Sequence, residues 1–392
     1  MSHSLTRVFL ALLACVAIGP WATALDAERR AEARVAIDRG IAYLVERQAQ
    51  DGSWSPGPGP AITALALRVM LLQPGIDAAD PAAAKAIEYI LAHRQPDGGI
   101  YGDILPNYNT AISVSALSLL TNHPEAADAV AGAQDFLRSL QWQVGMTDPD
   151  GRTIDESHPY YGGAGYGGSG RPDMSNTNLL LQALHDSGLD CNDPAFQRAL
   201  VFIARCQGIA SNDLYADAID RDGGFIYSTS INKDLIGVPE SKANPVLMKE
   251  LVDEGAAGRD VSGLRTYGSM TYAGFKSYLY ADLPPDDERV AAALAWISDN
   301  YDFTRNPGMP EPARLQGLYY YWMTAGRALD AWGATYVDTA DGPRDWANDL
   351  IDTVTAAQRE DGSWANAEPR WMESNPEMAT CFALIALHAA ID

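Results

Sequence analysis

Cysteine is scarce in this sequence, with four residues among 392. Cys15 lies in the first apolar segment, which leaves three cysteines for the folded chain. Cys191 and Cys206 flank a helix predicted over 194–206, which would hold them roughly 18 Å apart at 1.5 Å per residue, beyond disulfide reach. Cys381 lies in an apolar segment, where a thiol acts as a small buried hydrophobe. We therefore expect an apolar core, rather than a disulfide scaffold, to stabilise the fold.

Positive charge is also scarce: 28 Lys and Arg face 51 Asp and Glu, for a formal net charge of −23. A surface this acidic repels phosphate backbones and anionic lipid headgroups, so we expect no nucleic-acid partner. The six histidines include no pair spaced four residues apart, and neither a phosphate-loop lysine nor a Gly-x-Ser-x-Gly turn is present. The sequence therefore indicates no metal and no cofactor.

Long apolar runs are missing except at the N-terminus. After Arg7 the apolar segment 8–18 is too short to span a bilayer, and residues 22–24 (Ala-Thr-Ala) form a small-x-small cleavage signature. We expect residues 1–24 to be a signal peptide, and the mature chain to be exported (periplasmic or extracellular) without a transmembrane segment. A lipoprotein signal at Cys15 is the alternative.

Internal repetition is what the sequence has in abundance. The segment 39–54 ends in Gln-Ala-Gln-Asp-Gly-Ser-Trp, and the segment 351–364 ends in Gln-Arg-Glu-Asp-Gly-Ser-Trp. Each copy reads as an amphipathic helix that runs into a glycine-containing turn, and a more apolar helix follows it. Weaker or degenerate copies lie at 86–101, 133–143, 199–227 and 292–301.

The more apolar helices are predicted over 64–72, 110–120, 176–189, 271–283, 318–332 and 377–390. Their sequences are apolar nearly all round, as is typical of helices packed on both sides. Their alternation with six less apolar helices predicts an all-α fold, an (α/α)6 toroid whose inner ring lies inside an outer ring. We expect residues 25–392 to form a single such domain, with irregular insertions at about 144–175 and 228–268.

The pattern Gln48-x-x-x-Gly52-x-Trp54 resembles the QW motif of squalene-hopene and oxidosqualene cyclases. Over most of residues 33–391 the chain resembles the prenyltransferase and squalene oxidase repeat superfamily. That superfamily includes terpenoid cyclases, protein prenyltransferase subunits and uncharacterised secreted bacterial proteins. The resemblance implies the α/α toroid and, as an expected function, binding of or action on an isoprenoid-like ligand.

Two sets of catalytic residues that the family uses are missing. The Asp-x-Asp-Asp acid of squalene-hopene cyclases is absent, and the nearest acidic run, 285–288, lies where an outer helix is expected to begin, so helix capping explains it. By resemblance, the zinc ligands of protein prenyltransferases align with Gln316, Leu318 and Ala379, none of which binds zinc. Both of these activities are therefore disfavoured.

Polar and aromatic residues gather at the predicted starts of the inner helices, the end that forms the cavity mouth in the family. Asp173 and Glu373 are the candidate catalytic acids, and Arg171 and Arg370 are their expected partners. Aromatic faces beside carboxylate, amide and guanidinium groups suit a ligand with both apolar faces and hydroxyls. The candidate ligand-binding residues are Tyr108, Asn109, Tyr166, Arg171, Asn176, Tyr267, Tyr272, Tyr320, Arg370 and Trp371.

Three functions stay open on this evidence. The first, implied by the family, is a protein that binds or transforms a small lipophilic ligand. The second is a carbohydrate-active protein, either a polysaccharide lyase or a glycosidase, and a glycosidase would use Asp173 and Glu373 as its carboxylate pair. The third is a non-catalytic interaction module, because many repeat proteins bind through a concave face and do no chemistry.

Overall fold

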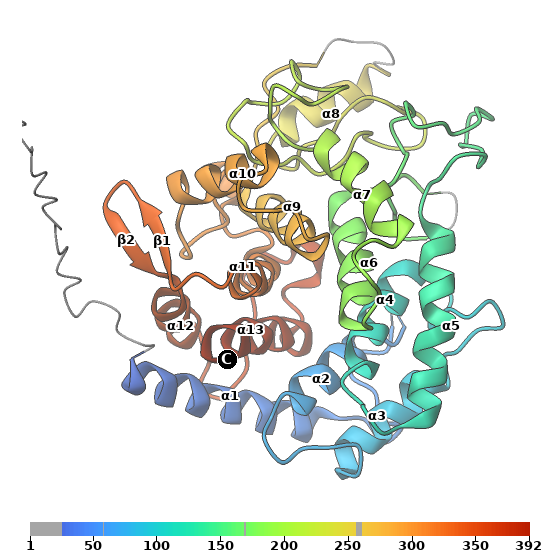
Figure 1. Ribbon diagram of the computed structural model, residues 1–392. Coiled ribbons are helices and arrows are strands. Elements are labelled where there is room, and N and C mark those ends of the chain that lie inside the picture. Colours follow the sequence, from blue (N-terminus) through green and yellow to red (C-terminus); the bar gives the residue numbers. More distant parts are fainter. Residues whose placement is uncertain (1–25, 58, 168–169, 256–260) are drawn as a thin grey trace, which may run out of the picture.

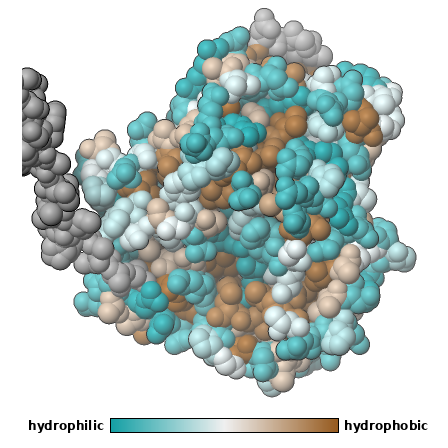
Figure 2. All heavy atoms as spheres, in the orientation of Figure 1, coloured by the Kyte–Doolittle hydropathy of each residue, from teal (hydrophilic) through white to brown (hydrophobic). Residues whose placement is uncertain are grey.

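The computed structural model describes residues 26–392 apart from 58, 168–169 and 256–260. These residues form thirteen α-helices, two short 3-10 helices and one two-stranded hairpin. The predicted signal peptide, residues 1–24, lies outside the described residues. Within the described part of the chain, no helix is both long enough and apolar enough to cross a membrane. Figure 2 shows hydrophilic residues over much of the viewed face, with hydrophobic patches among them.

Six helices form an inner ring (Figure 1). Each contacts the next in chain order, and the last contacts the first, so the contacts close the ring. These helices are buried nearly all round, as their continuous apolar sequences predict. This helix-rich arrangement is consistent with an α/α toroid. The six are α2 (Ala61–Leu71), α4 (Pro106–Leu117), α6 (Met174–Asp186), α9 (Gly268–Tyr280), α11 (Leu318–Trp332) and α13 (Pro376–Ile391).

Six amphipathic helices lie outside this ring. Their N-caps are aspartates, or a histidine in α5, and each cap accepts a hydrogen bond from a backbone N–H of the first turn. Asp287 from the acidic run at 285–288 caps α10 in this way, which confirms the capping interpretation of that run. The outer helices are α1 (Ala27–Arg47), α3 (Pro81–Leu91), α5 (Pro124–Leu140), α7 (Pro194–Arg205), α10 (Glu288–Asp299) and α12 (Trp346–Ala356).

Glutamines that follow outer helices tie one outer helix to another. In each case the side-chain amide donates to a backbone carbonyl at 2.8–2.9 Å. One of these bonds joins the end of α12 to α1 across 322 residues, and it closes the outer ring where the two ends of the chain meet. The pairs are Gln48 with Ala82, Gln141 with Ala195, Gln207 with Arg289 and Gln358 with Ala36.

The tryptophans at the ends of the two strongest repeats are fully buried. The indole N–H of Trp364 donates to the Val354 carbonyl at 2.8 Å, and its backbone N–H donates to the Thr380 hydroxyl at 3.0 Å. Trp54 makes the equivalent pair of bonds. Each tryptophan therefore joins an outer helix to the inner helix that follows it. Gly362 permits the close turn, because a Cβ there would meet a carbonyl oxygen of α1 at 2.6 Å.

The structure differs from the predicted elements in three places. Inner helices begin up to four residues earlier than predicted, as at Pro106, because proline suits the first helical position and Asp173 caps α6. The insertion predicted as irregular over 228–268 contains α8 (Pro245–Asp253). A hairpin of β1 (Tyr336–Thr339) and β2 (Gly342–Asp345) was not predicted, since its strands have only four residues each.

Candidate functional site

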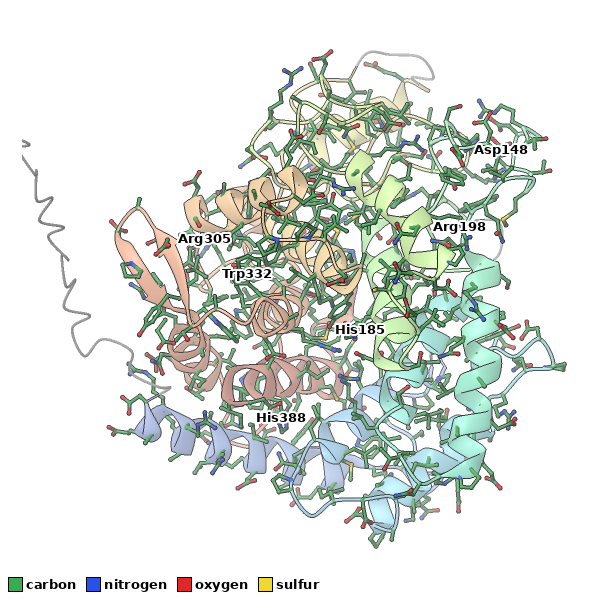
Figure 3. The ribbon with its side chains drawn as sticks, in the orientation of Figure 1. Asp148, His185, Arg198, Arg305, Trp332 and His388 are labelled. Carbon is green, nitrogen blue, oxygen red and sulfur yellow. The ribbon has the colours of Figure 1, made fainter. Side chains whose placement is uncertain are left out.

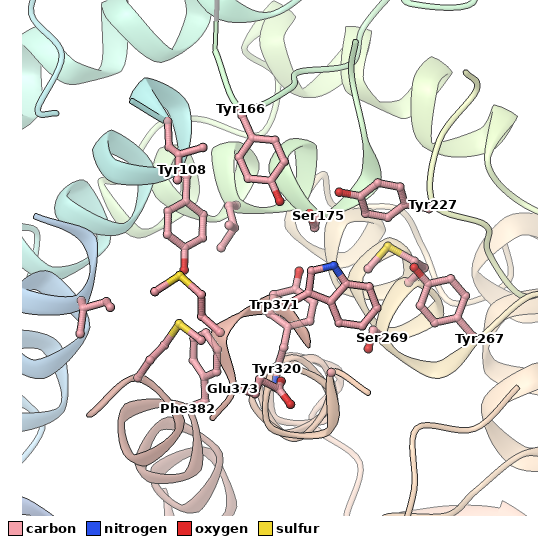
Figure 4. Close-up of a pocket in the computed structure, with 17 residues that line it drawn as sticks. Tyr108, Tyr166, Ser175, Tyr227, Tyr267, Ser269, Tyr320, Trp371, Glu373 and Phe382 are labelled. Carbon is pink, nitrogen blue, oxygen red and sulfur yellow. The ribbon is translucent and has the colours of Figure 1, made fainter. Parts of the chain in front are cut away.

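A cavity of about 200 Å³ lies at the N-terminal ends of the inner helices, and we refer to it as the ligand cavity (Figure 4). All six inner helices contribute residues from near their N-terminal ends. Because the chain enters every inner helix at the same end, residues far apart in the sequence meet here. The lining comprises Ile62, Leu105, Tyr108, Tyr166, Ser175, Leu179, Tyr227, Tyr267, Ser269, Met270, Gly317, Tyr320, Trp371, Met372, Glu373, Met378 and Phe382.

Half of the predicted site residues lie in this lining: Tyr108, Tyr166, Tyr267, Tyr320, Trp371 and Glu373. Figure 4 shows Tyr166 and Tyr227 on the same side of the cavity as Ser175, with Trp371 across from them. Tyrosine hydroxyls supply most of the polar atoms, while the remaining surface is aromatic or aliphatic. Such a lining suits an apolar ligand that carries few polar groups.

Three predicted site residues build helix starts instead of lining the cavity. Asp173 caps α6, and its Oδ1 accepts hydrogen bonds from the Asn176 backbone N–H at 2.9 Å and from the Ser175 hydroxyl at 2.8 Å. The side-chain amide of Asn176 donates to the same carboxylate. Asn109 accepts a hydrogen bond from the backbone N–H of Ala61, so it ties α4 to α2. Asp173 therefore positions Ser175, which does line the cavity.

The predicted arginine partners of the two acids are not the ones observed. Arg171 forms an ion pair with Glu240 at 2.6 Å instead of with Asp173, and its guanidinium lies 5.2 Å from the ring centroid of Tyr227. Arg370 lies over the Trp371 ring at 4.7 Å instead of pairing with Glu373. Sequence proximity suggested both pairs, but the short segments around Arg171 and Arg370 turn these side chains onto aromatic rings.

Tyr272 is a core residue of the ring and does not line the ligand cavity. Its ring packs edge-on against Tyr321, with ring centroids 5.5 Å apart. Conversely, the sequence analysis missed Tyr227 and Ser175 in the lining. Tyr227 follows the Asp-Gly-Gly-Phe turn of a weaker repeat, so the position of that turn was the available signal.

Glu373 is the carboxylic acid of the lining. Its Oε1 accepts a hydrogen bond from the Tyr320 backbone N–H at 2.8 Å, and its Oε2 accepts one from the Asn366 side chain at 2.8 Å. Helix α11 has no side-chain cap of its own at Gly317, so Glu373 caps it from another segment. Burial raises the pKa of Glu373 to about 7, although the backbone amides of α11 and the Asn366 amide favour its charged form.

The segment before Glu373 has a strained backbone. Trp371 and Met372 have φ angles of 55° and 64°, the left-handed region that non-glycine residues rarely adopt. Leu105, another residue of the lining, has a φ of 55° as well. Each such residue costs of the order of 1–2 kcal/mol, and strained backbone of this kind concentrates at functional sites. The strain holds the Trp371 ring against Gly317, where a Cβ would lie 3.1 Å from the indole.

The pKa of Glu373 predicts a measurable pH dependence of stability. The folded protein keeps a proton up to about pH 7 that the unfolded chain releases near pH 4.5, so raising the pH through this window favours unfolding. Wild type should lose stability as the pH rises from 5 to 8, whereas Glu373→Gln has no carboxyl group to titrate there. The unfolding free energy of the variant minus that of wild type should therefore increase by about 2–3 kcal/mol over this range. Urea denaturation at a series of pH values measures this, and parallel curves for the two proteins would contradict it.

The described residues show neither a metal site nor an activated thiol. No group of three or more His, Cys, Asp or Glu among them is placed to hold a metal ion. Cys206 and Cys381 are buried and free, and burial raises the pKa of both thiols. Both thiols therefore stay protonated at neutral pH, in agreement with the packing role predicted for Cys381.

Similar proteins are found only at the level of structure. Neither the protein-family models nor the curated proteins include a match to this chain. A protein from Actinoplanes is 16% identical with a TM-score of 0.51, covering 92% of this chain and 100% of its own. The type II terpene cyclase MstE from Scytonema is 13% identical with a TM-score of 0.50, and the match covers 92% of this chain and 98% of the cyclase. A D-mannose isomerase is 12% identical with a TM-score of 0.54, and the match covers 94% of this chain and 99% of the isomerase. At these identities the likeness shows a shared fold only, and that fold hosts both terpenoid and carbohydrate proteins.

Proposed function

We propose that this protein binds an isoprenoid-like, lipophilic ligand in the ligand cavity. The observation that carries the proposal is the lining itself, in which aromatic and aliphatic side chains from all six inner helices form a mainly apolar surface. A cavity of this kind binds its ligand by removing apolar surface from water, at about 25 cal/mol per Å². The finer assignment, an exported member of the squalene-cyclase and prenyltransferase repeat proteins, is part of this proposal.

Glu373 is the acid that would meet the ligand. With a pKa of about 7 it is partly protonated at neutral pH, so it can donate a hydrogen bond or a proton to an oxygen of the ligand. Ser175, Ser269 and the indole N–H of Trp371 are the other non-phenolic polar side-chain groups of the lining. Asp173 acts as a positioning residue, because it holds the Ser175 hydroxyl from behind.

The carbohydrate alternative has less support. A glycosidase needs two carboxyl groups that flank one bond, and among the described residues of the lining Glu373 is the one carboxylic acid. Asp173 caps α6 and does not line the ligand cavity, so it supplies no second carboxyl group there. An interaction module would not need a concave cavity lined by aromatic side chains, so a small ligand is favoured over a protein partner.

Removal of the Trp371 ring tests the proposal. Trp371→Ala is expected to weaken binding of farnesol, used as a probe, by about tenfold or more, because the ring covers one side of the cavity. Isothermal titration calorimetry measures both proteins. Val246→Ala is the control, since Val246 is an exposed apolar side chain on α8 that does not line the cavity. The proposal fails if farnesol does not bind wild type, or if both variants bind it equally well.

A further inference from the structure

A second chamber of about 20 Å³, which we call the lower chamber, adjoins the ligand cavity. Tyr108, Leu179, Tyr320 and Phe382 line both spaces. The rest of its lining comes from later turns of the inner helices and includes Arg68, Gln182 and Arg327. Arg68 lies six residues beyond Ile62 of the ligand cavity on α2, about 9 Å farther along the ring axis. His185 and His388, which Figure 3 labels, lie near the C-terminal ends of α6 and α13.

The lining of the lower chamber carries two guanidinium groups, Arg68 and Arg327, and no carboxylate among the described residues. Arg68 and Arg327 each pair with the same carboxylate, Asp186, at 3.0 Å. Lys276 is buried beside them, and its ammonium donates to the side-chain oxygen of Gln182. Burial lowers the pKa of Lys276 well below its usual value. Behind the lining, Asp186 pairs with both arginines and Asp330 interacts with Arg327, inside a protein whose overall charge is strongly negative.

The guanidinium of Arg68 still has an unused donor. One of its terminal nitrogens donates to the Ser115 carbonyl and to Asp186, while its buried Nε has no hydrogen-bond partner. A buried charged donor without an acceptor is costly, so an acceptor is expected to complete it. The carbonyl ends of the inner helices lie at this end of the ring, and their partial negative charge favours the cationic side chains placed there.

We propose that the lower chamber is a site for one small anionic group, held by Arg68 and Arg327. Its volume admits a group about the size of a water molecule or two, which fits a carboxylate or a halide but not a bulky polyanion. The carboxylate would be the end of the ligand whose apolar body fills the ligand cavity, and in this form the inference rests on the proposed function. A free halide is the other source of the same chemistry.

A matched pair of probes distinguishes the two sources. Farnesoic acid and farnesol share an apolar chain and differ in the end group, so calorimetry at pH 7.5 isolates the effect of the anion. For wild type we expect the acid to bind at least tenfold more tightly. Arg68→Met should abolish this preference, because Asp186 keeps its pairing with Arg327 while the lining loses the guanidinium whose Nε has no partner. Arg68→Lys should restore part of it, and Arg138→Met on the outer helix α5 should leave it unchanged.

Thermal unfolding in chloride and in gluconate at equal ionic strength tests the free-ion source. A chloride-specific rise in Tm for wild type, absent in Arg68→Met, supports an anion site even if neither lipid binds, and in that case the proposed function fails alone. Equal binding of acid and alcohol by wild type, together with no chloride effect, overturns the anion site and leaves the proposed function standing. If neither lipid binds and chloride has no effect, both are overturned. The wild-type comparisons decide the question even if Arg68→Met does not fold.

Discussion

Trp364→Ala is expected to lower the free energy of unfolding by about 3–5 kcal/mol, the range typical of removing a large buried aromatic side chain. The ring is fully buried, and its two hydrogen bonds connect α12 to α13 close to where the C-terminal helices meet α1. Truncation leaves a cavity at this closure and also leaves the Val354 carbonyl without its indole donor. Urea denaturation monitored by circular dichroism measures the loss.

Trp371→Ala is the matched control for this prediction. Trp371 is 37% exposed and packs on a strained segment at the ligand cavity, so its removal should cost less than about 1 kcal/mol. The two tryptophans should thus separate stability from binding: Trp364 for the first and Trp371 for the second. Equal losses of stability in the two variants would show that closure at Trp364 does not stabilise the ring as described.

Asp186→Asn is expected to lower the free energy of unfolding by a similar amount, about 3–5 kcal/mol, because it leaves buried guanidinium groups without a counter-charge. The same two arginines hold the pKa of Asp186 well below its usual range. The ion pairs of Asp186 therefore stabilise the fold at pH values above about 4, the pKa of Asp186 in the unfolded chain. This stabilisation is lost as the pH falls further and Asp186 becomes protonated in the folded protein. Urea denaturation at pH 7 measures the variant.

Asp352→Asn provides the comparison at an exposed site. Asp352 pairs with Arg29 at 2.7 Å, but both side chains are well exposed to solvent. Exposed ion pairs contribute about 0–1 kcal/mol, so this variant should stay close to wild type. A cost for Asp186→Asn as small as that for Asp352→Asn would mean that the charges around the lower chamber are solvated.

The sequence predicted the helical repeat well, because each repeat carries its own signals. Glutamine, glycine and tryptophan at 48, 52 and 54 recur at 358, 362 and 364, and burial on both sides makes the inner helices apolar all round. Helix boundaries were less accurate, since proline and aspartate at the first turn extend the inner helices toward the N-terminus. The hairpin β1–β2 escaped prediction because strands of four residues carry little periodicity.

The candidate site was only partly predictable. The position of the cavity followed from the common direction of the inner helices, and six predicted residues do line it. The lower chamber could not be predicted, because Arg68, Lys276 and Arg327 lie on three different inner helices and no local motif links them to Asp186. Glu240, the partner of Arg171, lies in a segment without periodicity, so its pairing depends on the folded chain.

Native mass spectrometry of the protein purified from its own cells tests the central claim most directly. Any bound ligand would be extracted and identified by tandem mass spectrometry. The account predicts a bound lipophilic molecule of the isoprenoid class, lost in Trp371→Ala and retained in Val246→Ala. A bound oligosaccharide, or a ligand-free protein that binds glycans and not farnesol, would contradict this account. The cavity would then be a carbohydrate-binding site.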